Sequence, residues 1–573
     1  MLLALPAVGC GGEDTGVTGA SFGSGSSTGQ PIPIGTDGSS SGAGSISASG
    51  DSTGDETTTG ESTTTAADET GPGDETGSST GSDTTGPVEC EPGGDQPDIN
   101  YLDEDGDGID GVACAAVFVS AIAGSDLNGG LGQNDAVQSI SRGIEIAATF
   151  EPPRMVLVSR GNYSETVNLE SGVSIYGGYD PLTWERDIEA NRTSVVGDEN
   201  RTVIAQNLEA AVTMQGFTVE GASYQFDSQS SYAIWVRDTP DGLLTIDSCE
   251  VRAGDAGAGD AGEPGTAGDT GGNGAPGSGA SGGAGGASTC GANGGIGGSA
   301  FDCGSNPGGD GLNGGDGTAV GVGGAPGQNQ CGGCSDEGGN ASGGGNGGVG
   351  ADGDGGQSPD SGIGGFDGSG LWMPAVGTPA TRGLHGGGGG GGGAGGTDDD
   401  GFFCGSDVDL GGGGGGAGAG GCGGEAGGAG MPGGGSFGIV VYASSISITN
   451  CDIFMGSGGS GGDGGTGGNG GGHGSFAGGS SGEEEGGSGA SGGLGGDGGA
   501  GGGGAGGCGG PSVGIATVSG TVINTSNVSF DGGASGEIGI GGSGGVHPGS
   551  TQEAPAGEDG CVGLLDDIHD YDA

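Results

Sequence analysis

The sequence predicts an all-β protein: a parallel β-solenoid with an N-terminal capping helix, long glycine-rich insertions and a disordered N-terminal stalk. Three stretches, which start at Leu244, Ile446 and Val522, share one pattern: counting from Ile246, Ile448 and Ile523, the third residue on is small and the fifth is β-branched. A repeated inward pattern of this kind is typical of stacked rungs. Glycine-rich sequence follows each stretch at the same point, so the glycine tracts are interpreted as insertions between rungs.

Composition limits where a core can form. Of 573 residues, 166 are Gly and only 30% are hydrophobic. Glycine loses the most backbone freedom on folding, so a long glycine tract becomes ordered only when something regular compensates that entropy. The hydrophobic core is therefore expected in the segments that are poor in glycine.

The predicted organisation follows these shifts in composition. The expected segments are a lipoprotein-type signal (1–10), a disordered acidic Ser/Thr/Gly linker (11–88), the first part of the solenoid (89–256), a glycine-rich insertion (257–436), a rung (437–456), a second glycine-rich insertion (457–511), another rung (512–534) and an acidic C-terminal tail (535–573).

A helix is expected over residues 135–148, because Val137, Ile140, Ile144 and Ala147 recur at spacings of three and four. It would cover the open end of the solenoid, where an uncovered rung exposes unpaired strand edges. Short β-branched runs separated by turn residues predict strands at 155–159, 166–169, 173–176, 202–205, 212–219 and 233–236.

These runs carry a recognisable resemblance. The sequence from Ala116-Val-Phe-Val-Ser through Val156-Leu-Val-Ser-Arg-Gly to Val173-Ser-Ile-Tyr-Gly-Gly-Tyr179 resembles the pectate-lyase-like right-handed parallel β-helix superfamily. More narrowly, it is similar to uncharacterised extracellular β-helix lipoproteins of myxobacteria. The resemblance covers residues 115–254 and the two later rungs, and it implies a right-handed β-helix without specifying an activity.

The glycine insertions have a period of three. Gly recurs every third residue over 259–277 and 492–510, and residues 458–471 repeat Gly-Gly-x. This period fits an extended helix with three residues per turn, whose free backbone groups can pair sideways with neighbours. A collagen-like triple helix and plain disorder are the alternatives. The composition also resembles the glycine-rich part of mycobacterial PGRS proteins.

Charge excludes one class of partner. The formal net charge is -65, and the only basic side chains other than His are nine Arg, since Lys is absent. Nucleic acids, which are polyanions, would be repelled and are excluded as partners.

The N-terminus and the cysteines indicate an extracytoplasmic protein. A short apolar run ends in small residues before Cys10, which resembles a bacterial lipoprotein signal and makes Cys10 the expected lipidation site. Acylation of Cys10 would leave twelve of the 13 cysteines. The expected location is the outer membrane at the cell surface, or outside the cell after secretion, with membrane contact only through the lipid anchor.

An acidic segment resembles the start of a calcium loop. Asp103, Asp105 and Asp107 alternate, Gly108 occupies the sixth position, and Asp110 follows. Cys114 stands at position twelve, where an EF-hand has a bidentate Glu. Asp103, Asp105, Asp107 and Asp110 are the candidate Ca²⁺ ligands, and the alternative is an acidic linker or turn.

Candidate catalytic residues are sparse. In-register stacking would place Glu250 above Asp452 at about 5 Å, the separation of a retaining glycosidase pair, with Asn527 continuing the column. A solvated face or a cation site is the alternative. His473 lies inside a glycine tract and is expected to be incidental. Arg237 and Arg252 are conceivable lyase residues, but each is expected to balance neighbouring acids.

The remaining cysteines have two interpretations each. Cys249 and Cys451 would lie in adjacent rungs, either disulfide-bonded or as small buried residues. The cysteines of the glycine tracts would form disulfides, with zinc binding as the alternative, because no His accompanies them at ligand spacing. They are Cys290, Cys303, Cys331, Cys334, Cys404, Cys422 and Cys508.

The expected function is therefore a non-catalytic one on the cell surface or outside the cell: structural, adhesive or ligand-binding. A polysaccharide or another cell-surface ligand is the expected partner. The alternative is a carbohydrate-active β-helix enzyme, a lyase or a glycoside hydrolase. No catalytic residue is assigned.

Overall fold

The computed structural model describes residues 94–240, 242–312, 318–332, 337–360, 362–400 and 407–572. All of them belong to the second of two compact units, Gly86–Ala573. The prediction of an all-β protein built from parallel strands is confirmed for this unit, whose two large sheets have only parallel neighbours. The predicted signal and linker, including Cys10, lie outside the described residues.

The strands form three columns, and the chain visits the columns in the same order on every pass. Parallel pairing links each strand to the one above it in its own column. The first column holds β1 (Ala116–Val119), β2 (Met155–Ser159), β5 (Ile175–Tyr179), β8 (Val212–Gln215) and β11 (Leu244–Asp247). The second holds β3 (Gly161–Ser164), β6 (Thr193–Val196), β9 (Phe217–Glu220) and β12 (Glu250–Arg252).

Two long strands, β21 (Ser445–Ser457) and β23 (Val522–Ala534), pass through both of these columns, which joins them into one sheet. The third column is a separate six-stranded sheet. It consists of β4 (Val167–Leu169), β7 (Arg201–Gln206), β10 (Ser231–Arg237), β20 (Ser436–Tyr442), β22 (Ser512–Val518) and β24 (Leu565–Asp570).

The core lies between the columns. Inward side chains such as Val156, Met214, Ile246 and Ile448 are fully buried in one cluster that draws on both large sheets. Strand β2 has the predicted bounds, and the other five predicted strands appear with ends moved by up to three residues. The run predicted at 212–219 is two strands, because Gly216 turns the chain with a φ of 78°.

The predicted helix is present but shorter than predicted. Helix α1 spans Ile140–Ala147, and the Ser139 side chain caps it by accepting the Arg142 N–H. Val137 is not helical, because it pairs with Val119 in a parallel bridge. Ile140, Ile144 and Ala147 are buried, and the helix packs against β1, β2 and β4.

The register of the first two predicted rungs is confirmed, and that of the third is wrong. Ile246 pairs with Ile448, and Val251 with Ile453. Ile448 then pairs with Thr525, and Ile523 lies two residues away, opposite Ile446. A slip of two residues keeps every side chain on its own face, so alternation could not detect it.

Residues with positive φ at the corner between the first two columns fix the register. Ser248, Asn450 and Asn527 have φ of 49°, 53° and 53°. Asn tolerates this left-handed conformation better than most residues. Aligning Asn450 with Asn527 gives the observed register, whereas the prediction had aligned Cys451 with Ser526.

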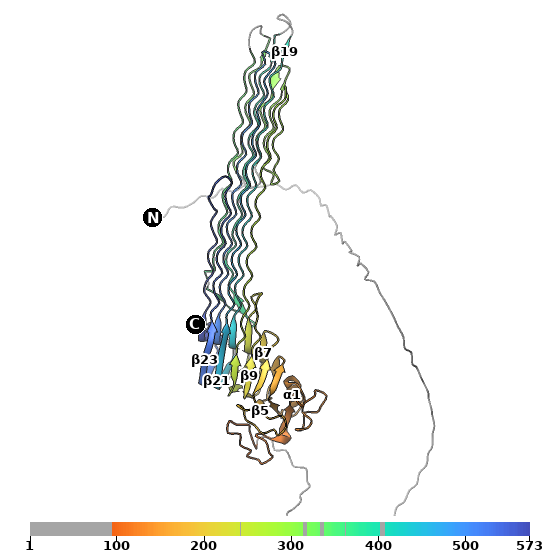
Figure 1. The fold of residues 1–573 in the computed structure, drawn as a ribbon, viewed down its shortest axis with the longest axis vertical. Helices are drawn as coiled ribbons and strands as arrows, with labels where there is room; N and C mark the ends of the chain where they lie inside the picture. Colours follow the sequence, from red (N-terminus) through yellow and green to blue (C-terminus); the bar gives the residue numbers. More distant parts are fainter. Residues whose placement is uncertain are drawn as a thin grey trace, which may run out of the picture. The chain divides into compact units, whose positions relative to one another are not determined.

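Glycine-rich segments leave the sheets at one corner, between the second and third columns. The first joins β12 to β20, the second joins β21 to β22, and a third, residues 535–564, joins β23 to β24. This third segment and β24 lie in the region expected as an acidic C-terminal tail. Figure 1 shows the segments running on from the strands, side by side, as a long bundle.

Backbone hydrogen bonds between neighbours hold the bundle together. The N–H groups of Gly259, Gly262 and Gly265 donate to the carbonyls of Ser460, Asp463 and Thr466 at 2.7–2.8 Å, and both numbers rise together, so these segments are parallel. Gly428 and Glu425 donate to Glu263 and Thr266, so that pair is antiparallel. The described parts of the tracts are thus ordered, and their antiparallel neighbours exclude a collagen-like triple helix.

A segment that lies deeper in the bundle has glycine at more of the three positions of its repeat. In residues 259–277, glycine fills one position of every three, and this position faces one neighbour. In residues 458–471, glycine fills two positions of every three. Residues 411–424 are nearly all glycine and are buried on all three faces. A Cβ on Gly414, Gly415 or Gly416 would lie 1.9–2.1 Å from a carbonyl oxygen of a different neighbour.

Three small sheets interrupt the bundle. They are β13 (Ala300–Phe301) with β14 (Gly304–Ser305); β15 (Gln330–Cys331) with β18 (Asp398–Asp399) and β19 (Val408–Asp409); and β16 (Gly364–Phe366) with β17 (Trp372–Pro374). Residues around β16 and β17 return to cover the six-stranded sheet, where Trp372 packs with Tyr232 and Phe437. A short 3-10 helix, Ala113–Ala115, precedes β1.

Candidate functional site

The predicted carboxylate pair lies beside an open cleft of about 440 Å³ over the second column. Glu250 and Asp452 are register partners on β12 and β21, as predicted. The column continues with Ser529, not with Asn527. The prediction for Asn527 was wrong because of the two-residue slip of β23, and its amide instead donates to Asn450 at 3.0 Å.

Both carboxylates are already engaged. Glu250 pairs with Arg192 at 3.2 Å and with Arg252 on its own strand. Asp452 accepts a hydrogen bond from the Ser529 hydroxyl. An ion-paired Glu beside a hydrogen-bonded Asp is the arrangement of a charge-balanced surface.

Two other candidate residues, Arg237 and His473, do not converge on this cleft. Arg237 pairs with Asp238 at 2.9 Å and donates to the Ser369 carbonyl, which holds the covering segment on the six-stranded sheet. His473 contacts Asp497 at 2.6 Å within the bundle. Arg237 and Arg252 therefore balance neighbouring acids, as expected from the sequence.

A polar ladder crosses the rungs at the corner of the first column. Arg186, buried with Asp110 at 3.0 Å, donates to Gln215, and Gln215 donates to Asp247 on the next strand. Thr449, on the strand after that, also donates to Asp247. Sequence reasoning missed this ladder, whose members lie up to 339 residues apart.

Hydrogen bonding sets the ionisation of this ladder. Burial alone would raise the pKa of Asp247, but donors on Thr449, Gln215 and Asn450 outweigh it and lower the pKa. Burial raises the pKa of Asp110, although Arg186 opposes the change. The ladder therefore ties successive rungs together through a charged Asp247.

The predicted calcium ligands separate into two groups. Asp103 and Asp105 each bring a carboxylate oxygen within 4.8 Å of one on Asp95. Asp107 is not in this group, and Asp110 is the buried partner of Arg186. Backbone N–H groups donate to Asp103 and Asp105 as well as to Asp107. Asp95 was not a predicted ligand, because it precedes the alternating motif by eight residues.

Disulfides staple the glycine bundle, as predicted. They join Cys290 with Cys422, Cys303 with Cys331, and Cys508 with Cys561. Cys114 is also disulfide-bonded. The predicted residues Cys334 and Cys404 lie outside the described residues.

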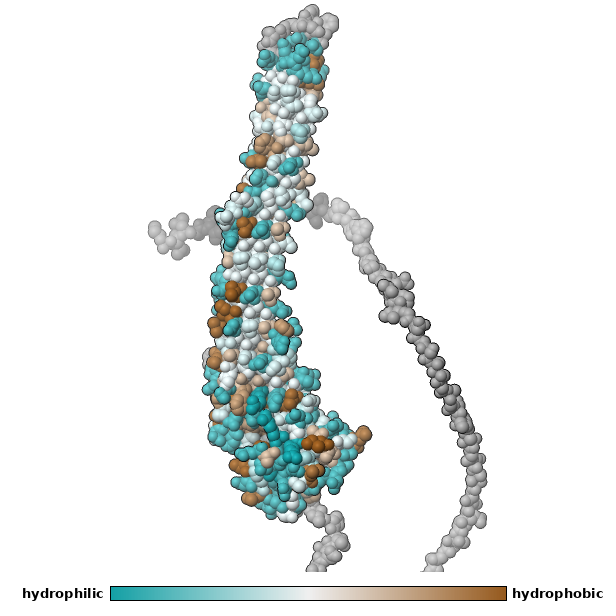
Figure 2. Space-filling view, viewed as in Figure 1, coloured by the Kyte–Doolittle hydropathy of each residue, from teal (hydrophilic) through white to brown (hydrophobic). Residues whose placement is uncertain are grey.

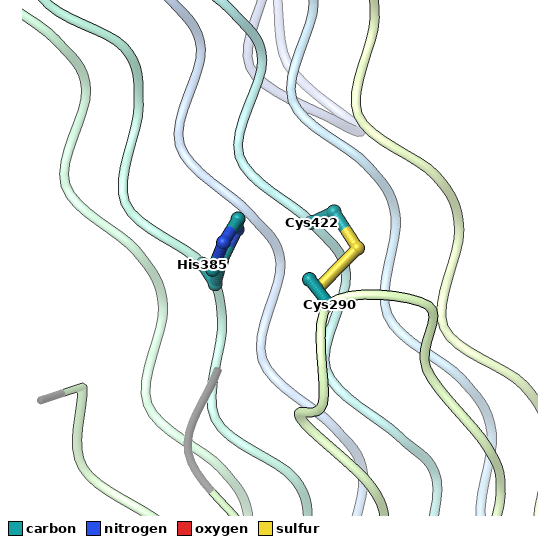
Figure 3. A group of neighbouring side chains, drawn as sticks. All are labelled: Cys290, His385 and Cys422. Carbon is teal, nitrogen blue, oxygen red and sulfur yellow. A yellow bond between two sulfur atoms is a disulfide. The ribbon is translucent and has the colours of Figure 1, made fainter. Parts of the chain in front are cut away.

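A histidine lies beside one of these disulfides, although none is at ligand spacing in the sequence. Figure 3 shows His385 on a segment beside the Cys290–Cys422 disulfide, 95 residues from Cys290 in sequence. The ring already interacts on both nitrogens, accepting the Gly423 N–H at Nδ1 and contacting Arg382 at Nε2. Sulfurs joined in a disulfide are not thiolate ligands, which makes this a structural cluster.

Cys249 and Cys451 are free and buried in adjacent rungs. A hydrogen bond with Cys451, together with burial, raises the pKa of Cys249 well above its usual range. These two cysteines therefore act as small core residues, the second of the two interpretations.

Side chains on the bundle surface add a regular set of contacts. Asn340, Asn346 and Asp352, six residues apart, accept the N–H groups of Ser488, Leu494 and Ala500 at 2.8–3.0 Å. Each replaces a carbonyl as the acceptor between two neighbouring segments. Six-residue spacing of Asn and Asp within a three-residue glycine period is the sequence signal for this ladder.

Figure 2 shows the bundle surface as mostly neutral in hydropathy, with scattered hydrophilic and hydrophobic residues on the face in view. Within the part of the chain that the structure describes, no helix is long and apolar enough to cross a membrane. Comparisons with protein-family models, with curated proteins and with solved structures find no match for this chain.

Proposed function

We propose that this chain is a non-catalytic extracytoplasmic protein in which a right-handed parallel β-helix carries a rigid glycine-helix rod. The rod would hold its distal end away from the β-helix and present polar side chains along its length. Its role would be structural or adhesive, toward a polysaccharide or another cell-surface ligand. This proposal includes the kinship with pectate-lyase-like β-helix proteins that the sequence resembles.

One observation carries the proposal. In the central segment, the consecutive N–H groups of Gly415, Gly416 and Ala417 donate to Ala490, Ala275 and Gly295, on three different neighbours, at 2.9–3.0 Å. A segment bonded in three directions cannot bend without breaking bonds on several sides. Rigidity of this kind suits a spacer and serves no step of a reaction.

The dimensions fit a spacer. Residues 458–482 run outward from β21 before the chain turns back. At about 3.1 Å per residue, such a segment reaches about 80 Å. The outer positions of the rod hold Ser, Thr, Asn and Asp side chains, which are suited to hydrogen bonds with hydroxyl-rich ligands.

The disulfides support an extracytoplasmic location. Three disulfides within one bundle are typical of proteins that fold in an oxidising compartment. Anchoring through an acylated Cys10 completes the proposal. Metabolic labelling with a palmitate analogue tests this part, since Cys10→Ser would abolish the label and leave the folded rod unchanged.

Electron microscopy of the full chain tests the rod. We expect straight particles with a projection of about 80 Å, scaled from the rise of a three-residue helix. Flexible or collapsed particles would contradict the proposal. Binding to immobilised polysaccharides then tests the partner, with the bundle-disrupting glycine variants described in the Discussion as controls.

The enzyme alternative rests on the cleft beside Glu250 and Asp452. A panel of polysaccharides, with and without calcium, is incubated with the protein, and unsaturated and reducing ends are measured. The proposal predicts no release. Release that disappears in Glu250→Gln or Arg252→Ala would instead establish a carbohydrate-active enzyme.

A further inference from the structure

We propose that Asp95, Asp103 and Asp105 form a Ca²⁺ site at the N-terminal end of the folded unit, with Glu104 beside it. The site differs from the alternating motif in the sequence, because Asp95 replaces Asp107 and Asp110 as a ligand. It is independent of the proposed spacer function.

The buried carboxylate of Asp95 is the first reason. Asp95 is only 1% exposed, its Oδ2 accepts the Gly111 N–H at 3.0 Å, and its Oδ1 is buried with no hydrogen-bond donor. A buried carboxylate oxygen without a partner is strongly destabilising unless a cation or a donor reaches it. The other carboxylates of the site are near enough to share that cation.

The spacing of the oxygens is the second reason. One carboxylate oxygen from each of Asp95, Asp103 and Asp105 lies within 4.8 Å of the others. Oxygens bound to one Ca²⁺ at about 2.4 Å can lie at most about 4.8 Å apart. Asp103 and Asp105 are exposed, which leaves further positions for water, and Ca²⁺ readily takes six to eight oxygen ligands.

Charge is the third reason. Glu104 adds a fourth acidic residue, between Asp103 and Asp105 in the chain. Arg186, the partner of Asp110, also donates to Gln215 and to the Gly177 carbonyl. Among the described residues, no ion pair joins an arginine or histidine to Asp95, Asp103, Glu104 or Asp105.

The site would hold the residues between Asp95 and Gly111 against the sheet that contains β5. Asp95 holds Gly111, and the next contacts lead inward, because the Asp110 carbonyl accepts the Tyr179 hydroxyl at 2.6 Å. Tyr179 belongs to the buried cluster with Phe118 and Trp184. Ca²⁺ binding is therefore coupled to the order of this end of the fold.

Calorimetric titration of the full chain with CaCl₂ and with MgCl₂ tests the site. Nonspecific binding to so acidic a protein is suppressed in about 1 M NaCl, where the screening length is about 3 Å. We expect one saturable Ca²⁺ site that persists there, and a rise in melting temperature on adding Ca²⁺. Mg²⁺ should bind more weakly, because it demands a tighter octahedral shell.

Variants separate the site from the general charge. Asp95→Asn and the exposed Asp105→Asn should each weaken Ca²⁺ binding by at least about tenfold, since even groups that merely support metal ligands are worth that much. Asp463→Asn, which removes one charge from the bundle, should bind as the parent does. Circular dichroism verifies that each variant is folded, and Asp105→Asn tests the site even if Asp95→Asn does not fold.

Three results would overturn the proposal. They are the absence of a saturable site in high salt, equal weakening by Asp463→Asn, and affinity for Mg²⁺ equal to that for Ca²⁺.

Discussion

The β-sheets and the glycine bundle exclude water in opposite ways. In the sheets, large side chains such as Ile246, Ile448 and Ile453 fill the space between columns. In the bundle, residues 411–424 are buried with almost no side chains, and backbone hydrogen bonds meet directly. The sheets are stabilised mainly by apolar burial, and the bundle by hydrogen bonds and close backbone contact.

This difference predicts opposite tolerance to substitution. A core side chain between sheets can lose a methyl group and leave a small cavity, which its neighbours partly refill. A buried glycine in the bundle cannot gain a methyl group, because a carbonyl oxygen of a neighbouring segment already occupies the position of the added Cβ. The bundle should therefore be the less tolerant region, although its sequence has low complexity.

The largest effect is expected from adding methyl groups to one face of the central segment. A Cβ on Gly415, Gly418 or Gly421 would lie 1.8–2.0 Å from a backbone oxygen of residues 471–477. Overpacking typically costs about 1–3 kcal/mol per site, so the triple alanine variant should lose at least about 3 kcal/mol of stability. Thermal unfolding followed by circular dichroism measures the loss.

The matched control lies on the neighbouring segment. A Cβ on Gly478 meets nothing within 4 Å, and one on Gly472 meets only Thr270, at 3.7 Å. The double variant Gly472→Ala, Gly478→Ala should keep its stability or gain up to about 1 kcal/mol, because alanine restricts the unfolded chain. Equal loss in both variants would show that the bundle is not packed as described.

The next effect concerns the sheet core. Ile448 is fully buried between β11 and β23. Ile448→Val should cost about 0.5–1.5 kcal/mol and Ile448→Ala about 2–5 kcal/mol. Chemical denaturation measures both, and a valine variant as damaging as the glycine triple would remove the contrast between the two regions.

A smaller effect concerns pH. Asp247 has a lower pKa folded than its ordinary value of 3.8, so its stabilising contribution is complete above that value. It is lost as the pH falls through the folded pKa, because the unfolded chain takes up the proton first. Asp247→Asn should lose less stability than the parent on acidification below pH 3.8, by about 1 kcal/mol for the charged hydrogen bonds involved. Parallel acid-unfolding curves would contradict this assignment.

The smallest effect is on cysteine reactivity. Cys249 and Cys451 are buried, and buried structural cysteines are unreactive because reagents do not reach the sulfur. Iodoacetamide should label neither in the native protein and both after denaturation without reductant. Native labelling, or a missing pair of thiols after denaturation, would show that the rungs are open or that these cysteines are oxidised.

The sequence was most informative where a period repeats. The alternating pattern around Ile246 and Ile448 predicted neighbouring parallel strands, and the glycine period predicted segments whose backbone groups pair sideways. Alternation could not fix the third rung, because a shift of two residues preserves the face. The positive φ of Asn527 determines that register, and it depends on one corner residue, not on a pattern.

The sites were harder to predict because their members lie far apart in sequence. His385 joins Cys290 and Cys422 only through the folding of the bundle. Asp95 lies near Asp103 and Asp105 in the fold, whereas Asp107 is outside this group and Asp110 is paired with Arg186. Spacing in the sequence treats these carboxylates as equivalent, and only their positions in the fold distinguish them.

Hydrogen–deuterium exchange of the glycine tracts tests the central claim most directly. Over residues 259–271, every third N–H donates to a neighbour; over 459–471, two of every three do; and over 412–424, all of them do. We therefore predict protection of about one third, two thirds and all of the amides, since exchange requires the hydrogen bond to open. Fast exchange throughout all three tracts would contradict a hydrogen-bonded glycine bundle.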